Sequence, residues 1–198
     1  GLLRHVAAHD LDKHQRDRIE RIAASGRHLL GLVNNVLDIA KAEAKEQSHQ
    51  SEPIDLPELF EELVAMAEPL LQKRPAVKLD VHLADGLPVP ILDRAKLKQI
   101  LLNLLSNAAK FTDHGTITLS AACVADEWRF VVSDTGIGIS ADDQLRVFEN
   151  FEQVHSPGRR VEGTGLGLSI CAALANAMCG TITLTSRLGV GSAFTVIV

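Results

Sequence analysis

The segment DRAKLKQILLNLLSNAAK, residues 93–110, has the periodicity of an amphipathic helix. Asp93 is a suitable N-cap, and the run Thr112–Gly115 is suited to end the helix. Two asparagines, Asn103 and Asn107, interrupt the apolar positions. The apolar residues recur three and four positions apart, which predicts one face turned toward a core; they are Leu97, Ile100, Leu101, Leu104, Leu105 and Ala108.

The segments on both sides of this helix predict alternating strands and helices. Upstream, we expect a helix that is capped by Asp55, has Pro57 in its first turn and runs to about Gln72. Strands are expected at Lys78–Leu83 and Ile91–Leu92. Downstream, we expect strands Thr116–Cys123 and Trp128–Ser133 joined near Ala125–Asp126, a short helix Asp142–Phe148, a polar loop at 152–163, a helix from about Gly165 to Met178, and strands Thr181–Ser186 and Ser192–Val198. This order predicts an α/β sandwich, with helices layered on one face of a mixed sheet.

Residues 12–45 predict one long helix with a heptad seam, to which Ile19, Leu29 and Val36 belong. Such a helix needs a partner from the same chain or from a second copy, and residues 1–6 have the pattern of the end of such a partner helix. An ordinary amphipathic helix packed on the domain is the alternative. We therefore predict an α+β chain: a coiled-coil-like helical hairpin fragment at 1–46, a linker at 47–54 and the sandwich at 55–198.

The composition narrows the class of protein. Hydrophobic residues make up 46% of the chain, and the formal net charge of −5 gives no reason to expect nucleic-acid binding. The three scattered cysteines indicate reduced thiols in a cytoplasmic protein. No apolar run approaches the roughly 20 residues that span a bilayer, so we expect no membrane contact from this segment. The absence of an initial Met indicates a piece of a longer protein, whose membrane anchor, if any, lies elsewhere.

The first cluster of polar residues is Asn103, Asn107 and Lys110. Spacings of four and three place them close to one helix face. An amide oxygen is a good Mg²⁺ ligand, and a lysine can neutralise phosphate oxygens. A capping or gap-filling asparagine and a surface lysine are the alternative, but two amides in an apolar stripe favour a functional site.

The second cluster is Asp134-Thr-Gly-Ile-Gly138, at the end of a predicted strand. Gly136 and Gly138 permit a close approach of the backbone to a flat ligand. The Asp134 carboxylate can accept a hydrogen bond from an exocyclic amino group such as that of adenine. A plain turn with a capping aspartate is the alternative.

The third cluster is Gly163-Thr-Gly-Leu-Gly-Leu-Ser169, at the start of a predicted helix. The N–H groups and the dipole of a helix N-terminus suit a phosphate. A dinucleotide fingerprint needs a strand directly before the glycines, whereas a polar loop with Arg159 and Arg160 precedes them here. The P-loop pattern is absent.

Taken in order, these motifs together with Phe148-Glu-Asn-Phe151 resemble the N, G1, F and G2 boxes of sensor histidine kinases. That family belongs to the superfamily of the Bergerat fold, which includes gyrase and Hsp90. The resemblance covers about residues 10–198, and four boxes in the right order are far more specific than any one of them. It implies Mg²⁺ on Asn107, phosphates near Asn103 and Lys110, and adenine on Asp134, Gly136 and Gly138. It also implies a nucleotide contact at Phe151 and phosphate contacts along Gly163, Thr164, Gly165, Leu166, Gly167 and Leu168.

The resemblance implies a kinase that transfers the γ-phosphoryl group of ATP to a histidine. The phosphoacceptor motif is absent, so we expect that histidine on a helix upstream of Gly1 and expect no autophosphorylation of this fragment alone. It also implies a homodimer through residues 1–45 and a response regulator or receiver domain as partner. Two alternatives remain: a hydrolytic ATP-driven clamp, against which Asn103 argues because hydrolytic members carry a general-base glutamate there, and a binding module without catalysis.

Overall fold

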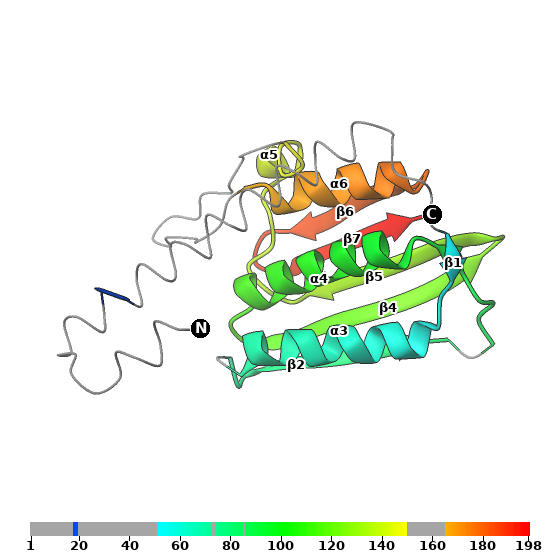
Figure 1. The fold of residues 1–198 in the computed structure, drawn as a ribbon. Coiled ribbons are helices and arrows are strands. Elements are labelled where there is room, and N and C mark those ends of the chain that lie inside the picture. Colours follow the sequence, from blue (N-terminus) through cyan, green and yellow to red (C-terminus); the bar gives the residue numbers. More distant parts are fainter. Residues whose placement is uncertain (1–17, 20–50, 73, 85, 150–164) are drawn as a thin grey trace. The chain divides into compact units, whose positions relative to one another are not determined.

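A computed structural model of the chain describes residues 18–19, 51–72, 74–84, 86–149 and 165–198 (Figure 1). The chain divides into two units, Gly1–Asp38 and Ile39–Val198. In the first unit only Arg18 and Ile19 are described, and both are helical. The predicted heptad helix and its dimerisation otherwise lie outside the described residues, and everything below concerns the second unit.

Five strands of this unit form one sheet in the order β2-β4-β5-β7-β6. β2 pairs with β4 in parallel, and the remaining neighbours pair antiparallel. The mixed sheet predicted from the sequence is therefore confirmed. The strands are β2 (Val77–Leu83), β4 (Gly115–Val124), β5 (Glu127–Asp134), β6 (Thr181–Arg187) and β7 (Gly191–Ile197).

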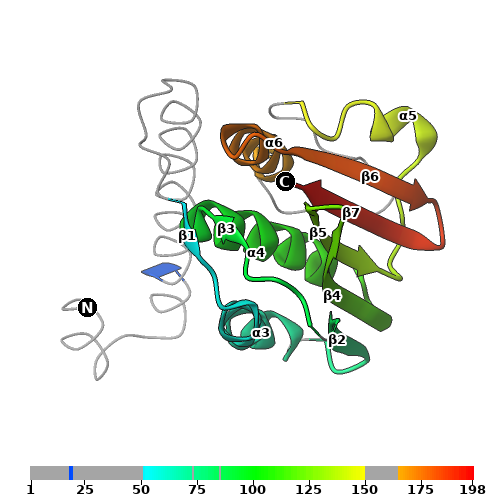
Figure 2. The ribbon, with the colours of Figure 1, turned by 90° about the vertical axis from the view of Figure 1, so that its right-hand side faces the viewer.

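Three helices cover one face of this sheet, as the sequence predicted (Figure 2). They are α3 (Leu56–Leu71), α4 (Arg94–Phe111) and α6 (Gly167–Ala177), and the short α5 is Ala141–Gln144. In β5 the alternate residues Trp128, Phe130 and Val132 are buried. That period of two is expected for a sheet with one packed face and one wet face.

Helix α4 packs between α3 and α6 and contributes more buried residues than either of them. All six apolar positions predicted for its inner face are 4% exposed or less. Its N-cap is Asp93, whose carboxylate accepts a hydrogen bond of 3.0 Å from the N–H of Lys96. Asp55 caps α3 in the same way, through the N–H of Glu58 at 3.0 Å. Both predicted caps are confirmed, and each satisfies one N–H that the helix itself leaves unpaired.

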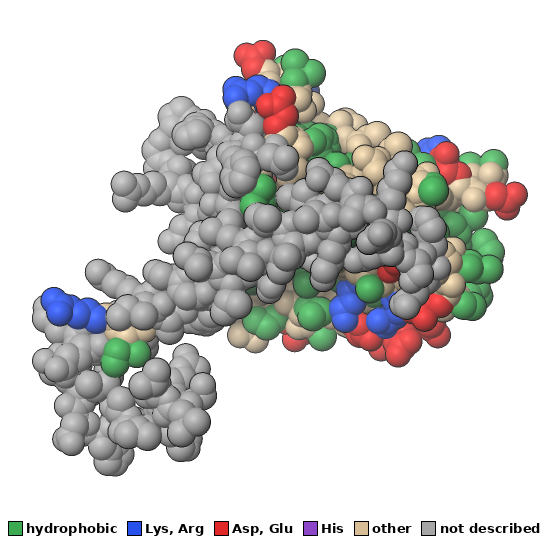
Figure 3. All heavy atoms as spheres, turned by 45° about the horizontal axis from the view of Figure 1, so that its top comes forward, with side chains coloured by type: hydrophobic (Ala, Val, Ile, Leu, Met, Phe, Trp, Pro, Cys, Tyr) green, Lys and Arg blue, Asp and Glu red, His purple; other side chains and the backbone are tan. Residues whose placement is uncertain are grey.

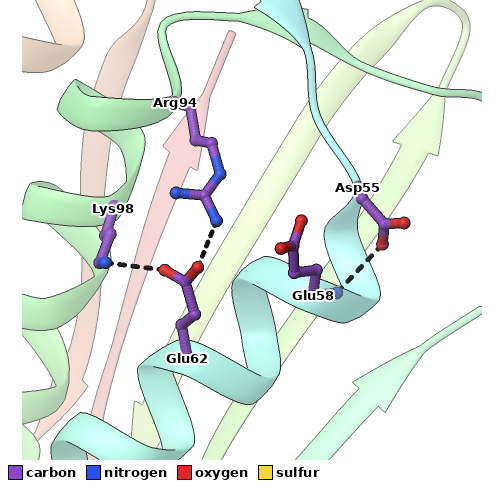
Figure 4. A network of polar contacts seen from close by, with 5 residues as sticks. All are labelled: Asp55, Glu58, Glu62, Arg94 and Lys98. Carbon is purple, nitrogen blue, oxygen red and sulfur yellow. Dashed lines mark hydrogen bonds and ion pairs between the residues drawn. The ribbon is translucent and has the colours of Figure 1, made fainter.

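An ion-pair network joins α3 to α4 at the surface (Figure 4). The carboxylate of Glu62 binds Arg94 at 2.6 Å and Lys98 at 2.7 Å. The hydrogen bond from Lys98, followed by that from Arg94, lowers the pKa of Glu62 below its usual value. On the face drawn in Figure 3, described Lys and Arg side chains lie next to Asp and Glu side chains rather than forming one continuous basic patch.

The structure shifts several predicted boundaries. Residues 52–53, placed in the linker, form β1 (Glu52–Pro53), which pairs with β3 (Ile91–Leu92). Ile54 is 1% exposed, and its N–H bonds to the carbonyl of Pro90 at 2.9 Å, so the end of the predicted linker is part of the folded domain. Helix α5 ends at Gln144 rather than near Phe148.

Helix α6 begins at Gly167 rather than at Gly165. Gly165 has φ +71°, a left-handed conformation that cannot continue a right-handed helix. Among the described residues, no helix combines the length and the apolar character needed to cross a membrane.

Candidate nucleotide-binding site

Asn103 joins the first and third sequence motifs. Its side-chain N–H donates to the main-chain carbonyl of Gly167 at 2.7 Å, at the first residue of α6. The same amide lies 3.5 Å from the Sγ of Cys171, one turn further along α6. A Cβ at Gly167 would lie 2.9 Å from the side-chain oxygen of Asn103, so the glycine permits this close packing. Asn103 thus contacts the start of the glycine-rich helix directly.

The second motif lies against the end of α4. The N–H of Ile137 donates to the carbonyl of Phe111 at 3.3 Å. A Cβ at Gly136 would lie 2.4 Å from the same carbonyl, so the loop can approach the helix only because residue 136 has no side chain. The sequence predicted a close approach of this backbone to a flat ligand, whereas the approach seen here is to the end of α4.

Asn107 lies on α4 midway between these two attachments, four residues from Asn103 and four from Phe111. Residues four apart share a helix face and are separated by about 6 Å along the axis. Asn107 is half-buried. The three motifs, which are far apart in the sequence, are therefore gathered along the C-terminal half of one helix. That is the arrangement the sequence required for a single site.

Asp134 is the last residue of β5 and follows the alternation of Phe130 and Val132 toward the helical face. Its carboxylate accepts a hydrogen bond of 2.8 Å from the N–H of Gly136. Burial raises the pKa of Asp134, while hydrogen bonds from the backbone N–H groups of Gly136 and Ser192 oppose that rise. The carboxylate is therefore partly desolvated, which strengthens its attraction for an incoming N–H donor.

The turn between β6 and β7 lies beside Asp134 and the loop that follows it. Gly138 has φ +66°, and a Cβ there would lie 2.1 Å from the carbonyl of Arg187. The hydroxyls of Ser186 and Ser192 lie 2.9 Å apart, and the N–H of Ile139 donates to Ser186 at 2.8 Å. The sequence analysis assigned no role to either serine, because a single serine in a strand carries no signal of a site.

No side chain caps the N-terminus of α6 among the described residues. Leu166 occupies the cap position and is 1% exposed. A helix start without a side-chain cap has N–H groups suited to an anion. Of the predicted phosphate contacts, Gly165, Leu166, Gly167 and Leu168 lie at this start; Gly163 and Thr164 lie outside the described residues.

Two further predicted residues are placed by aromatic contacts. The ammonium group of Lys110 lies 5.1 Å from the centre of the Phe111 ring, in the last turn of α4. Phe148 packs edge-to-face on Phe194 of β7, with ring centres 6.3 Å apart. Phe151, Arg159 and Arg160 lie outside the described residues.

The geometry is that of a known family. A sequence profile of the histidine kinase-, DNA gyrase B- and HSP90-like ATPases matches residues 92–198, more than half of the chain. The chain therefore belongs to this family. The match begins just before α4 and includes every described residue of the site above.

Its relatives within the family include histidine kinases and sensor proteins. The circadian input-output histidine kinase CikA of Synechococcus elongatus is 40% identical over 189 residues, 94% of this chain and 25% of CikA. The sensor protein TorS of Escherichia coli is 38% identical over 183 residues, 91% of this chain and 20% of TorS. The chain thus spans a quarter or less of the length of these two relatives.

Solved structures of histidine kinases have the same fold as this chain. Full-length ShkA in complex with AMPPNP is 33% identical, with a TM-score of 0.82 over 95% of this chain and 39% of ShkA. The nucleotide-free catalytic domain of histidine kinase ThkA is 26% identical, with a TM-score of 0.62 over 75% of this chain and 94% of that domain. The described sandwich is the catalytic ATP-binding domain of a sensor histidine kinase, and ATP is its nucleotide.

Proposed function

We propose that this chain binds Mg-ATP along the C-terminal half of α4 and supplies the γ-phosphoryl group to a histidine on a helix upstream of Gly1. One observation carries the proposal. The glycine-rich start of α6 and the loop after Asp134 are bonded to the same helix, two turns apart, with Asn107 between them. A phosphate site and an adenine site therefore flank a metal ligand.

Each end of the nucleotide has a chemically suitable partner. The exocyclic amino group of adenine is a donor, and Asp134 is a partly desolvated acceptor beside Gly136 and Gly138. The triphosphate carries negative charge, which the N-terminus of α6 and Lys110 attract. Asn103 contributes by holding the first turn of α6 in place.

The donor set fits Mg²⁺. Among the described residues, no group of three or more His, Cys, Asp or Glu could hold a metal ion. Mg²⁺ is commonly held by one or two protein oxygens together with substrate phosphates and water. The half-buried side-chain amide of Asn107 carries such an oxygen. When bound, Mg²⁺ would neutralise charge on the transferring phosphoryl group.

Transfer to a protein histidine is favoured over hydrolysis. A general base within hydrogen-bond reach of a water is needed for rapid hydrolysis. Asn103 stands at the position of that base in hydrolytic members, and its amide is engaged with Gly167. A neutral amide bonded to a carbonyl cannot accept a proton from water.

We also propose a cytoplasmic location, a homodimer through residues 1–45, and a response regulator or receiver domain as the acceptor of the phosphoryl group. The names of the relatives support this, because CikA is a histidine kinase and TorS a sensor protein. Size-exclusion chromatography with light scattering would test the dimer. A molar mass of one chain at all concentrations would contradict it.

Calorimetry with ATP and Mg²⁺ tests the site. We expect Asp134→Ala to abolish binding, and Asn107→Ala to remove mainly the Mg²⁺-dependent part. Unimpaired affinity in both variants would contradict the site. Incubating the chain with γ-labelled Mg-ATP and a separate histidine-bearing helical hairpin tests the reaction. Labelled hairpin indicates a kinase, free phosphate an ATPase, and neither product a binding module.

A further inference from the structure

Arg74 lies between α3 and β2, outside every motif described above. Its guanidinium donates to the carbonyl of Lys110 at 2.9 Å and to the carbonyl of Thr112 at 2.8 Å. It also forms an ion pair with the carboxylate of Asp113. One side chain thus binds three of the four residues from 110 to 113, where α4 ends.

The main chain of Arg74 is itself held in place. Its N–H donates to the carbonyl of Leu71 at 2.7 Å, and its carbonyl accepts from the N–H of Val77 at 3.0 Å. The side chain is 24% exposed. Because the backbone on both sides is bonded and the side chain is mostly covered, the guanidinium is an anchored group rather than a mobile surface charge.

The position of Arg74 suits the end of a helix. The last carbonyls of a helix have no partner within it and carry partial negative charge, so a cation there is stabilising. Hydrogen bonds from a charged donor are stronger than those between neutral groups. Arg74 therefore opposes fraying of the last turn of α4.

The adenine-side loop depends on the same short segment. The N–H of Ile137 bonds to the carbonyl of Phe111 at 3.3 Å. The N–H of Thr116 donates to the hydroxyl of Thr135 at 2.9 Å, and the N–H of Thr135 donates to the carbonyl of Thr116 at 3.1 Å. Three hydrogen bonds thus attach the residues that follow Asp134 to residues 111–116, and Arg74 contacts this segment directly at 112 and 113.

We propose that Arg74 is a positioning residue of the nucleotide site, which holds residues 110–113 so that the loop 134–138 keeps its geometry for adenine. The proposal rests on the proposed function, since it assumes that Asp134 binds the base. Arg74 acts through Phe111 and Thr116, and it also holds the backbone of Lys110, the predicted phosphate contact. The sequence analysis did not single out Arg74, because a single arginine in a turn has the pattern of an ordinary surface residue.

The test compares Arg74→Ala with Arg94→Ala. Arg94 is a matched control: its side chain is 27% exposed and binds Glu62 near the other end of α4, far along the helix from the loop 134–138. We expect Arg74→Ala to raise the Kd for ATP about tenfold, as loss of charge-assisted hydrogen bonds would, and Arg94→Ala to change it less than about twofold. Arg74→Lys should be intermediate, because an ammonium can bind Asp113 but cannot span both carbonyls in the fork geometry of a guanidinium.

Amide hydrogen exchange without nucleotide gives a second readout. In Arg74→Ala, exchange should accelerate at Thr135 and Ile137, while the amides of β6 and β7 keep their protection. Equal loss of affinity in the Arg74 and Arg94 variants, or unchanged affinity and exchange in Arg74→Ala, would overturn the proposal. If the wild-type protein binds no ATP, the proposed function is wrong. The exchange measurement still tests Arg74 separately, because unchanged exchange in Arg74→Ala would disprove its link to the loop 134–138. Should Arg74→Ala not fold, Arg74→Lys and Asp113→Asn provide the same comparison.

Discussion

The side-chain amide of Asn103 and the main-chain carbonyl of Gly167 share a hydrogen bond of 2.7 Å across 64 residues of sequence. It joins the helix that carries the predicted metal ligand to the helix start that carries the predicted phosphate contacts. A glutamate at this position, as in hydrolytic members of the superfamily, could not donate such a bond, because an ionised carboxylate only accepts. The asparagine therefore has a structural reason to be present, besides removing a general base.

A double-mutant cycle at Asn103 and Gly167 measures this contact. In Gly167→Ala the new Cβ would lie 2.9 Å from the Asn103 oxygen, so the amide must move. We expect each single change, Gly167→Ala and Asn103→Ala, to lower the free energy of unfolding by about 1–2 kcal/mol. With the amide removed there is room for the methyl group. The loss of unfolding free energy in the double variant should therefore be smaller than the sum of the two single losses, by at least about 0.5 kcal/mol. Urea denaturation checks the cycle, and strict additivity would contradict direct contact.

Asp134 should make the domain without nucleotide less stable as pH rises. Burial raises its pKa in the folded state above the usual value of an aspartate. Between the unfolded and folded pKa values the folded protein binds more protons than the unfolded chain, so the free energy of unfolding falls as pH rises through this window. We expect Asp134→Asn to gain stability relative to wild type as the pH rises above about 4, until the Asp134 carboxyl of the folded wild type is fully ionised. The variant should bind ATP more weakly.

Urea midpoints at several pH values measure this difference. The matched control is Asp126→Asn, which removes the same charge at an exposed position in the β4–β5 turn, where φ is +66°. Asparagine tolerates that left-handed backbone as well as aspartate does. A stability difference at Asp134 that does not change with pH would contradict the raised pKa.

Thr112 carries a buried hydroxyl that we expect not to stabilise the fold. The residue is 0% exposed, and its Oγ1 has no hydrogen-bond partner among the described residues. A buried polar group without a partner costs about 1–3 kcal/mol. We expect Thr112→Val, which keeps the shape and the N–H bond to Ala108, to leave the free energy of unfolding unchanged or raise it by about 1 kcal/mol.

Thr112→Ser is the converse control, because it keeps the hydroxyl and removes the methyl group. It should lose about 1 kcal/mol through the deleted methyl group. Chemical denaturation of both variants measures the pair. A Thr112→Val protein that is clearly less stable than wild type would show that the hydroxyl has a partner.

The cysteines should differ sharply in reactivity. Burial raises the pKa of the Cys171 thiol to about 12, and Cys171 is fully covered beside Asn103. Cys179 is exposed at the end of α6. The thiolate is the nucleophile, so iodoacetamide at pH 8 should alkylate Cys179 quickly in the native protein and Cys171 only after unfolding. Peptide mass spectrometry distinguishes the two, and rapid native labelling of Cys171 would contradict its packing.

The sequence by itself determined most of the elements, the layers and the class of protein. Local rules suffice for these: Asp55 and Asp93 cap helices because of short-range geometry, and period-two burial in β5 follows from the pleat. The four boxes carried the family because each requires particular residue types at short spacing. Boundaries shifted where a distant partner intervened, as at Glu52–Pro53, which pairs with Ile91–Leu92.

Only the tertiary structure decided which groups meet. No local pattern could assign Asn103 to Gly167 or Arg74 to the end of α4, because each pair is brought together by the packing of separate elements. The pKa of Asp134 likewise depends on how much water the neighbouring loops exclude. Side-chain chemistry is written in the sequence, whereas proximity and desolvation arise when the chain packs around one core.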